Sequence, residues 1–275
     1  MQTMDGLHQD HTIDIEKIVA AKFPGKKIPK WFLAWVKRLI HQDFLNGFFE
    51  KGCEGVEFCT ETIKYLDINM EVEGLERVRV PEGSRITFAS NHPLGGVDGV
   101  AVAGIVGTHF GEKGIRLLVN DFLMAVKGLQ PLCIPVNKTG AQARDLPQKV
   151  AEIYNSEANV VIFPAGLCSR KIGGVIQDLP WSKNFIKMSR QTGRYVVPVH
   201  FIGQNSKRFY NVANLCKLLK LKFNFAMIFL PDELYRARHG SYKVVFGDPI
   251  PAETFDKSRT DQQWAAWVRE KVYQL

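Results

Sequence analysis

The sequence predicts an α/β fold in which a mainly parallel central sheet is flanked by helices. Between residues 85 and 203, apolar strand-like runs alternate with segments of helical periodicity. These runs, such as 159–163 and 195–202, are apolar throughout and do not alternate with polar residues. Continuous runs of this kind are typical of parallel strands that helices cover on both faces.

The chain is expected to divide into an N-terminal helical segment, residues 1–66, and an α/β domain, residues 67–275. Helices are predicted at 12–22, 29–50 and 54–66, where apolar residues recur every three or four positions. Pro24 and Gly25 separate the first two helices. Pro29 suits the first turn of the second helix, because a residue there has no intrahelical partner for its N–H.

The helix predicted at 29–50 is amphipathic, with large apolar side chains at helical spacing and three cations beside them. The apolar residues are Trp31, Phe32, Trp35, Leu39 and Phe44, and the cations are Lys30, Lys37 and Arg38. Tryptophan and lysine on one amphipathic helix suit a membrane interface, so we expect a membrane-association segment. The alternative is an aromatic face packed on the domain core, and the two arrangements can hold along different parts of the helix.

Within the α/β domain the period changes to two at 70–73, and Gly74 marks the turn that follows. Further strands are expected in short apolar runs, at 86–89, 115–119, 132–136, 159–163, 195–202, 225–230 and 243–246. Helices are expected at 97–110, 141–155, 181–191, 207–220 and 264–273, with a helix or turn at 120–128.

Basic residues are concentrated in two stretches of this 275-residue chain, whose net charge is +8. Residues 17–42 contain seven Lys or Arg, residues 179–231 contain nine, and neither stretch contains an acid. Such stretches attract polyanions: nucleic acid, anionic lipid or a phosphorylated carrier. The interleaved residues are Trp, Phe, Leu and Ile, and no known nucleic-acid-binding signature accompanies them, which favours lipid over nucleic acid.

The five cysteines are scattered and form no CxxC pair, which indicates reduced intracellular thiols and argues against a zinc ribbon. The first residues are polar and acidic, unlike a secretory signal. The longest uncharged apolar run, 223–230, has eight residues, whereas a spanning helix needs roughly 20. We therefore expect a cytoplasmic protein that is peripheral on the inner face of the cell membrane.

The stretch 90–99, SNHPLGGVDG, reads as a strand end, a glycine-rich turn and a helix start. It places His92 six positions before Asp98, with Asn91, Gly95 and Gly96 beside them as candidate substrate-binding residues. A carboxylate near a histidine can hold the tautomer of the ring and support it as a general base. The alternative is an ordinary turn with a packed histidine and an N-capping aspartate.

No nucleophile accompanies this histidine and aspartate. The sequence has no G-x-S-x-G elbow, no P-loop lysine after the glycines and no GxGxxG fingerprint. A base without an internal nucleophile suits reactions in which the substrate is the nucleophile. The base removes a proton from a hydroxyl or amine while that group attacks an activated acyl carbon.

A second motif, FPAGLCSRK at 163–171, follows another predicted strand. Amides at a proline-glycine turn, together with Arg170 and Lys171, can form an anion or oxyanion site. The alternative is a plain βα loop followed by solvated charges. Cys168 could act as a nucleophile with His92, but a thiol in such a loop is more often a small packed residue.

The polar loops are expected to meet at one edge of the sheet. His92 follows one strand, Asn137 and Lys138 follow a second, and the segment 163–166 follows a third. Ligands of parallel sheets gather beyond the carboxyl ends of the strands, so this edge is the predicted site.

The blocks NHPLGGVDG, FPAGLCSRK and YVVPVHFIG, in this order, resemble the glycerolipid acyltransferase (PlsC-like) superfamily. The blocks of that superfamily include NH-x4-D, FPEGTRS and VPV. The version here is most similar to the bacterial branch labelled "hemolysin", which includes glycine- and ornithine-lipid N-acyltransferases. The resemblance covers residues 30–250, although only the blocks are specific.

The resemblance implies a role for each matching residue. His92 would be the catalytic base and Asp98 its partner. The acceptor or thioester pocket would be shaped by Phe163, Pro164 and Gly166, with Ser169, Arg170 and Lys171 near the anionic group of the acceptor. Val197, Pro198 and Val199 would form a strand beneath the site, and Lys138 would stand where the family has arginine.

The resemblance further implies transfer of a fatty acyl group from acyl carrier protein or coenzyme A, in membrane lipid synthesis. The expected acceptor is the amine or hydroxyl of a small molecule, an amino acid such as glycine or ornithine. No resident cofactor or metal is implied; the partners are the thioester and membrane lipids, and not nucleic acid. The alternatives are a 1-acylglycerol-3-phosphate O-acyltransferase and a non-catalytic basic protein that binds membranes or nucleic acid.

Three departures from the family pattern mark a variant site. One extra residue separates His92 from Asp98, so the turn between them is expected to bulge. Ala165 replaces the acid of FPEG, and Cys168 falls where the family has arginine, with the cation two places later. The last two changes favour an anionic acceptor other than a glycerophosphate, such as an amino acid carboxylate.

Overall fold

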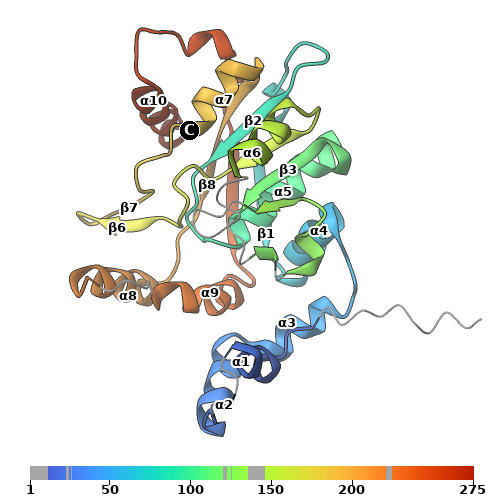
Figure 1. Cartoon of the computed structure of the whole chain (residues 1–275), viewed down its shortest axis with the longest axis vertical. Coiled ribbons are helices and arrows are strands. Elements are labelled where there is room, and N and C mark those ends of the chain that lie inside the picture. The colour runs from blue at the N-terminus through green and yellow to red at the C-terminus, as the bar shows by residue number, and fades with distance from the viewer. Residues whose placement is uncertain are drawn as a thin grey trace, which may run out of the picture.

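The computed structural model describes residues 12–22, 25, 27–119, 123–124, 126–135, 146–220 and 225–275 (Figure 1). It confirms the predicted α/β fold: within these residues a seven-stranded sheet has the order β1-β9-β8-β2-β5-β3-β4. The strands are β1 (Asn69–Glu73), β2 (Ile86–Ser90), β3 (Ile115–Val119), β4 (Cys133–Pro135), β5 (Asn159–Ile162), β8 (Tyr195–Ile202) and β9 (Ser241–Phe246).

The sheet is mainly parallel, and β2 lies near its centre between β5 and β8. Ala89 of β2 pairs with Ile162 on one side and Pro198 on the other, both in parallel register. The single antiparallel pairing among the described strands of this sheet joins β8 to β9. Since β9 pairs in parallel with β1, these two strands run opposite to the other five. The loops after β2 and β5 therefore leave the sheet side by side at the same edge.

Helices cover both faces of the sheet, as the apolar strands predicted. One face packs on α4 (Gly55–Tyr65) and α5 (Val97–Phe110), and the other on α6 (Leu146–Asn155), α7 (Asn184–Thr192) and α10 (Asp261–Gln274). Along β5, Val161 joins the first core, whereas Val160 and Ile162 join the second. Successive side chains of a strand point to opposite faces, so a strand buried on both sides must be apolar at every position.

Shorter elements lie beside the carboxyl edge of β2. A hairpin of β6 (Arg170–Ile172) and β7 (Val175–Gln177) begins at the end of the second motif. The helices α8 (Lys207–Leu218) and α9 (Leu230–Arg236) follow β8. A third apolar cluster unites Cys168 with Phe209, Tyr210 and Ala213 of α8 and with Ala226. Short 3-10 helices complete the described fold, at Leu75–Arg77, Glu112–Gly114, Lys127–Leu129, Phe225–Phe229 and Ala252–Thr254.

The N-terminal helices α1 (Ile15–Lys22), α2 (Lys30–Leu39) and α3 (Gln42–Phe49) lie at the end of the molecule away from α10 (Figure 1). The single helix predicted at 29–50 is wrong, because His41 takes a left-handed φ of 51° and divides it into α2 and α3. Phe48 of α3 is buried in the first core, whereas α2 has no buried residue. None of the described helices has the length and apolar character needed to cross a membrane.

The strand predicted at 225–230 is also wrong. Phe225–Phe229 form a 3-10 helix that leads directly into α9. The β6 and β7 hairpin was not predicted. The helix expected at 141–155 lies partly outside the described residues, and its described part is α6. The boundary between residues 66 and 67 stays a prediction; α4, on its N-terminal side, packs against α5.

Candidate active site

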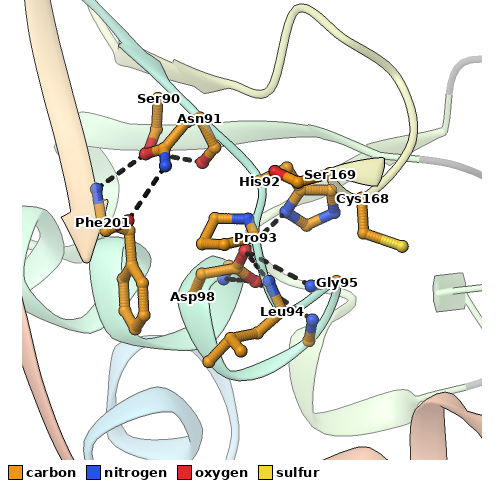
Figure 2. A network of polar contacts seen from close by, with 12 residues as sticks. Ser90, Asn91, His92, Pro93, Leu94, Gly95, Asp98, Cys168, Ser169 and Phe201 are labelled. Atoms are coloured by element: carbon orange, nitrogen blue, oxygen red, sulfur yellow. Dashed lines mark hydrogen bonds and ion pairs between the residues drawn. The ribbon is translucent and has the colours of Figure 1, made fainter. Parts of the chain in front are cut away.

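His92 and Asp98 face one another across the turn that joins β2 to α5 (Figure 2). The distance from His92 Nδ1 to Asp98 Oδ2 is 3.0 Å. The Asp98 side chain is fully buried in the first turn of α5, where the helix dipole favours a negative charge. Four backbone N–H groups of the turn also donate to its two oxygens: those of Leu94, Gly95, Gly96 and Gly99.

Burial and the contact between His92 and Asp98 shift the pKa of each residue in opposite directions. Burial alone lowers the pKa of His92, but the charge and the hydrogen bond of Asp98 outweigh it, so the pKa of His92 is raised. Burial alone raises the pKa of Asp98, but His92 and the backbone N–H groups outweigh it, so the pKa of Asp98 is lowered. An ionised carboxylate can only accept, so in the neutral imidazole Nδ1 carries the proton and Nε2 presents its lone pair.

Gly95 lies in the turn between His92 and Asp98, where a bulge was expected. Its φ of 75° lies in the left-handed region, which side chains other than glycine rarely adopt. A Cβ atom at this position would lie 3.0 Å from Cδ2 of Leu230 and 3.1 Å from Cβ of Cys168. The turn therefore depends on glycine both for its backbone conformation and for its close packing.

The second motif lies directly against His92. The ring of Phe163 packs against the imidazole with 4.3 Å between centroids and an angle of 34° between the ring planes. The backbone N–H of Ser169 donates to the carbonyl of His92 over 2.7 Å. Gly166, with a φ of 69°, closes the loop by donating to the carbonyl of Phe163, and the carbonyl of Pro164 accepts from the backbone N–H of Ser182. The structure thus brings the two predicted motifs together.

Arg170 supplies a cation beside the pair. Its Nη1 donates to the carbonyls of Cys168 and Ser169. Its Nη2 is buried and has no hydrogen-bond partner among the residues that the structure describes. A buried guanidinium N–H of this kind suits an oxygen of a bound anion. Lys171, one residue further along β6, is exposed.

Cys168 packs beside the turn as an ordinary thiol. The side chain is buried, and burial raises its pKa more than the charge of Arg170 and its hydrogen bond to the sulfur lower it. Nucleophilic cysteines need a lowered thiol pKa, so the environment of Cys168 does not favour that role.

Two predicted residues use their polar side-chain atoms within the protein. The Asn91 amide donates to the carbonyl of Phe201 and accepts from its N–H, which ties the end of β2 to β8. The Ser169 hydroxyl donates to Asp178 over 2.6 Å. Substrate contact by these two side chains stays a prediction. Lys138 lies outside the described residues.

Two residues that the sequence did not indicate hold the turn in place. Asp178 accepts from the backbone N–H of His92, and the Asn205 amide donates to the carbonyls of Pro93 and Leu94. Both are buried polar residues in loops and belong to none of the recognised blocks. The available signal is slight: Asp178 is the last acid before the acid-free stretch 179–231.

A cavity of about 350 Å³ adjoins the glycine turn on the side of α8 and α9. Its lining combines an apolar wall with charged groups: Leu94, Val97, Leu230 and Leu234, with Lys207, Glu233 and Arg236. Apolar pockets with a few polar groups are typical of small-molecule sites. Across the described ranges, no three His, Cys, Asp or Glu side chains converge in a way that could hold a metal ion.

A family model described as acyltransferase matches residues 17–275. The chain belongs to the acyltransferase family. Two curated relatives are named lyso-glycine lipid O-acyltransferase. The one from Bacteroides thetaiotaomicron is 49% identical over 267 residues, which cover 96% of this chain and 97% of the relative. The one from Phocaeicola vulgatus is 49% identical over 268 residues, covering 96% and 95%.

Among solved structures, 1-acyl-sn-glycerophosphate acyltransferase, PlsC, from Thermotoga maritima is similar at 16% identity. The match covers 89% of this chain and 92% of PlsC, with a TM-score of 0.49. The family match and the curated relatives confirm the resemblance to PlsC-like glycerolipid acyltransferases. This acyltransferase is therefore an enzyme of lipid synthesis, and the non-catalytic alternative is set aside.

Proposed function

We propose that this acyltransferase transfers a fatty acyl group from a thioester to the hydroxyl of a lyso-glycine lipid, with His92 as general base. The observation that carries the proposal is the contact between the partly buried His92 and the buried Asp98, which leaves Nε2 of the neutral ring as a proton acceptor, while the buried thiol of Cys168 beside it is not activated. Such a site suits direct attack by the acceptor on the thioester.

The reaction balances without a resident cofactor. Nε2 of His92 takes the proton of the acceptor hydroxyl as its oxygen attacks the thioester carbonyl. The C–O bond forms, the tetrahedral oxyanion collapses, and the C–S bond breaks. The imidazolium returns the proton to the leaving sulfur, so the products are an ester and a free thiol. The charge of Asp98 stabilises the imidazolium between the two steps.

Arg170 is proposed to bind the negative charge of the acceptor. A glycine carboxylate presents two oxygens, and the buried Nη2 of Arg170 is a donor suited to one of them. Ser169 and Lys171 flank Arg170 in the same motif and are proposed to shape this subsite. The absence of the family acid at Ala165 agrees with an acceptor other than a glycerophosphate.

The names of the curated relatives direct the proposal to a hydroxyl and not to an amine. Both relatives are called O-acyltransferases of a lyso-glycine lipid, and both match nearly the whole chain. The same base could serve the amine of free glycine or ornithine, so those acceptors are arms of the test. Lysophosphatidate is the arm for the glycerophosphate alternative.

The test measures acyl transfer by purified protein with labelled acyl carrier protein or labelled acyl-coenzyme A. The acceptors are lyso-glycine lipid, glycine, ornithine and lysophosphatidate, and the product is identified by mass spectrometry. We expect an O-acylated glycine lipid. A product from another acceptor alone would refute the proposed acceptor, and the two donors show which thioester is used.

Replacement of the base tests the mechanism. We expect His92→Ala to lower kcat by about 10²–10⁴-fold, because the acceptor hydroxyl loses its proton acceptor. Cys168→Ser is the control from the loop that packs beside this turn, and it should retain most of the activity. Full activity of His92→Ala, or loss of activity only in Cys168→Ser, would show that the assigned base is wrong.

We also propose that the enzyme works while peripheral on the inner face of the cell membrane, held there by α2. Three large apolar side chains of this helix face solvent: Trp31, Phe32 and Trp35 are 73%, 37% and 49% exposed. Lys30 and Arg38 of the same helix add positive charge. Indole rings and cations on one exposed helix suit the headgroup region of an anionic bilayer.

A further inference from the structure

Asp178 is a buried carboxylate on the loop between β7 and α7, outside every motif that the sequence indicated. Its side chain accepts three hydrogen bonds. Oδ1 accepts from the backbone N–H of His92 over 3.2 Å and from the Ser169 hydroxyl over 2.6 Å. Oδ2 accepts from the indole N–H of Trp181 over 2.9 Å. Asp178 is 2% exposed, so water does not substitute for these donors.

The main chain of His92 is thereby held from both sides by one region of the protein. Its N–H donates to Asp178, and its carbonyl accepts from the backbone N–H of Ser169. Ser169 in turn donates its hydroxyl to Asp178, which closes a ring of three residues. A residue whose backbone is fixed at both ends can direct its side chain within a narrow range.

We propose that Asp178 is a positioning residue for acyl transfer: it fixes the backbone of His92 and so directs the imidazole toward the reacting groups. This inference rests on the proposed function, since it assumes that His92 is the base. Asp178 itself does not touch the reacting atoms.

The charged groups around this ring define its electrostatics. Asp98 and Asp178 both raise the pKa of His92, and Arg170 lowers it. On the other side of Asp178, Arg269 donates to its carbonyl and Tyr273 accepts from its N–H. Burial raises the pKa of Asp178 more than its donors lower it. Each carboxylate oxygen nevertheless receives an N–H, and this arrangement favours the ionised form.

The test replaces the charge and keeps the size, with Asp178→Asn. We expect kcat to fall on the order of 100-fold: an asparagine amide accepts at one oxygen only and places its NH2 against a donor, which disturbs the alignment of His92. We also expect the acidic limb of the kcat/KM profile to move to lower pH. The sign follows from the charge: without the anion of Asp178 the pKa of His92 falls, so the neutral base persists at lower pH.

A second readout needs no substrate. In protein labelled with ¹⁵N-histidine, the imidazole of His92 is titrated by NMR, and its signal is assigned by its absence from His92→Ala. We expect a lower titration midpoint in Asp178→Asn than in the unmodified chain. A folded Asp178→Asn protein with an unreduced kcat, an unmoved midpoint and an unmoved acidic limb would overturn the proposal.

Two further variants separate positioning from folding. Trp181→Phe removes the donor to Oδ2 and keeps the contact to His92, so it should lower the melting temperature without moving the acidic limb. Asp178→Glu keeps the charge and displaces the oxygens; we expect an unmoved limb and a reduced kcat. If Asp178→Asn does not fold, an unreduced kcat in Asp178→Glu would overturn the proposal.

The assay also distinguishes failure of this inference from failure of the proposed function. If His92→Ala keeps full activity, His92 is not the base and the proposed function fails. If His92→Ala is inactive while Asp178→Asn matches the unmodified enzyme in rate and pH profile, only the inference about Asp178 fails.

Discussion

At the scale of single residues, the contact between His92 and Asp98 depends on other side chains that hold the turn between them. His92, Asp98 and Phe163 stand in recognisable blocks, and the structure brings them into contact. Asp178 and Asn205 act on backbone atoms of the turn. Any loop residue can make such bonds, so no residue pattern marks them in advance. Asn91 is the opposite case: it lies inside a recognised block, but its side chain bonds to the backbone of Phe201.

The glycine turn gives a prediction about Gly95. Gly95→Ala should destabilise the protein by about 1–2 kcal/mol for the left-handed backbone, and by about 1–3 kcal/mol more for crowding against Leu230 and Cys168. Activity should fall with it, because the turn carries both His92 and Asp98. Urea unfolding and steady-state kinetics measure the two effects.

Gly193→Ala is the matched control for that substitution. Gly193 also has a left-handed φ, of 67°, but an added Cβ would meet nothing within 4 Å. It should therefore show the backbone cost alone and leave the kinetics unchanged. Equal loss of stability in the two variants would mean that close packing at Gly95 contributes nothing.

At the scale of elements, the long and strongly patterned segments were predicted well. The helix at 97–110 was predicted at the bounds of α5, and the strand at 195–202 at those of β8. The error at 225–230 arose because a short, wholly apolar run has no period that distinguishes a strand from a helix. The strands β6 and β7 have three residues each, too few for alternation to show. Gly173 and Gly174 between them, both at positive φ, were the available signal for a hairpin.

The break between α2 and α3 is held by a contact that sequence periodicity cannot reveal. His41 stacks on Tyr235 of α9, with ring centroids 3.6 Å apart, and its Nε2 lies 2.8 Å from Asp232 Oδ1. Asp232 also forms ion pairs with Arg208 and Arg236. Partners so far apart in sequence hold His41 in the left-handed conformation that separates α2 from α3.

This contact makes stability depend on pH through Asp232. Burial raises the pKa of Asp232, but hydrogen bonds from His41 and Arg236 and the charge of Arg208 outweigh it, so the pKa is lowered. Its contribution is therefore complete above the ordinary carboxyl pKa and is lost as pH falls through the lowered value. Asp232→Asn should lower the free energy of unfolding at neutral pH by about 1.5–3 kcal/mol, and this difference should shrink in acid.

Asp67→Asn is the control for Asp232→Asn, because Asp67 forms the same kind of pair with His239 at the surface. Both side chains of that pair are largely exposed, at 80% and 70%. Its removal should change the free energy of unfolding by less than about 0.5 kcal/mol. Similar losses in the two aspartate variants would contradict the role given to Asp232.

At the scale of the whole molecule, the N-terminal helices extend from the α/β body (Figure 1), and α2 has no buried residue. Lys37 of α2 bonds Glu16 of α1 over 2.6 Å, and α3 anchors the segment through Phe48 in the core. Within this segment, α3 thus packs into the core, whereas α2 does not. Sequence periodicity left these two arrangements open, because it does not show which part of an aromatic face meets another element.

The proposed membrane contact predicts a measurable loss on removing the indoles. Trp31→Ala and Trp35→Ala should each weaken binding to anionic vesicles by about 1.5 kcal/mol or more, a factor of about ten. Added salt should weaken the binding of the unmodified chain. Co-sedimentation with phosphatidylglycerol vesicles measures both effects.

Val72→Ala is the control for the indole variants, since Val72 is an apolar side chain, 40% exposed, on β1 of the α/β body. It should leave vesicle binding unchanged. Vesicle binding that survives removal of both indoles would rule out α2 as the contact.

The pairing of β1 with β9 has a consequence for synthesis of the protein. Asn69 of β1 pairs with Ser241 of β9, and β9 also pairs with β8 on its other side. During translation, the backbone N–H and C=O groups of β1 and of one side of β8 therefore stay unpaired until β9 has been made. Such distant pairing slows folding, and open strand edges are sites of aggregation. In a chain stalled on the ribosome before residue 241, the sheet should lack β9. The domain can therefore complete its fold only after this last strand has been made.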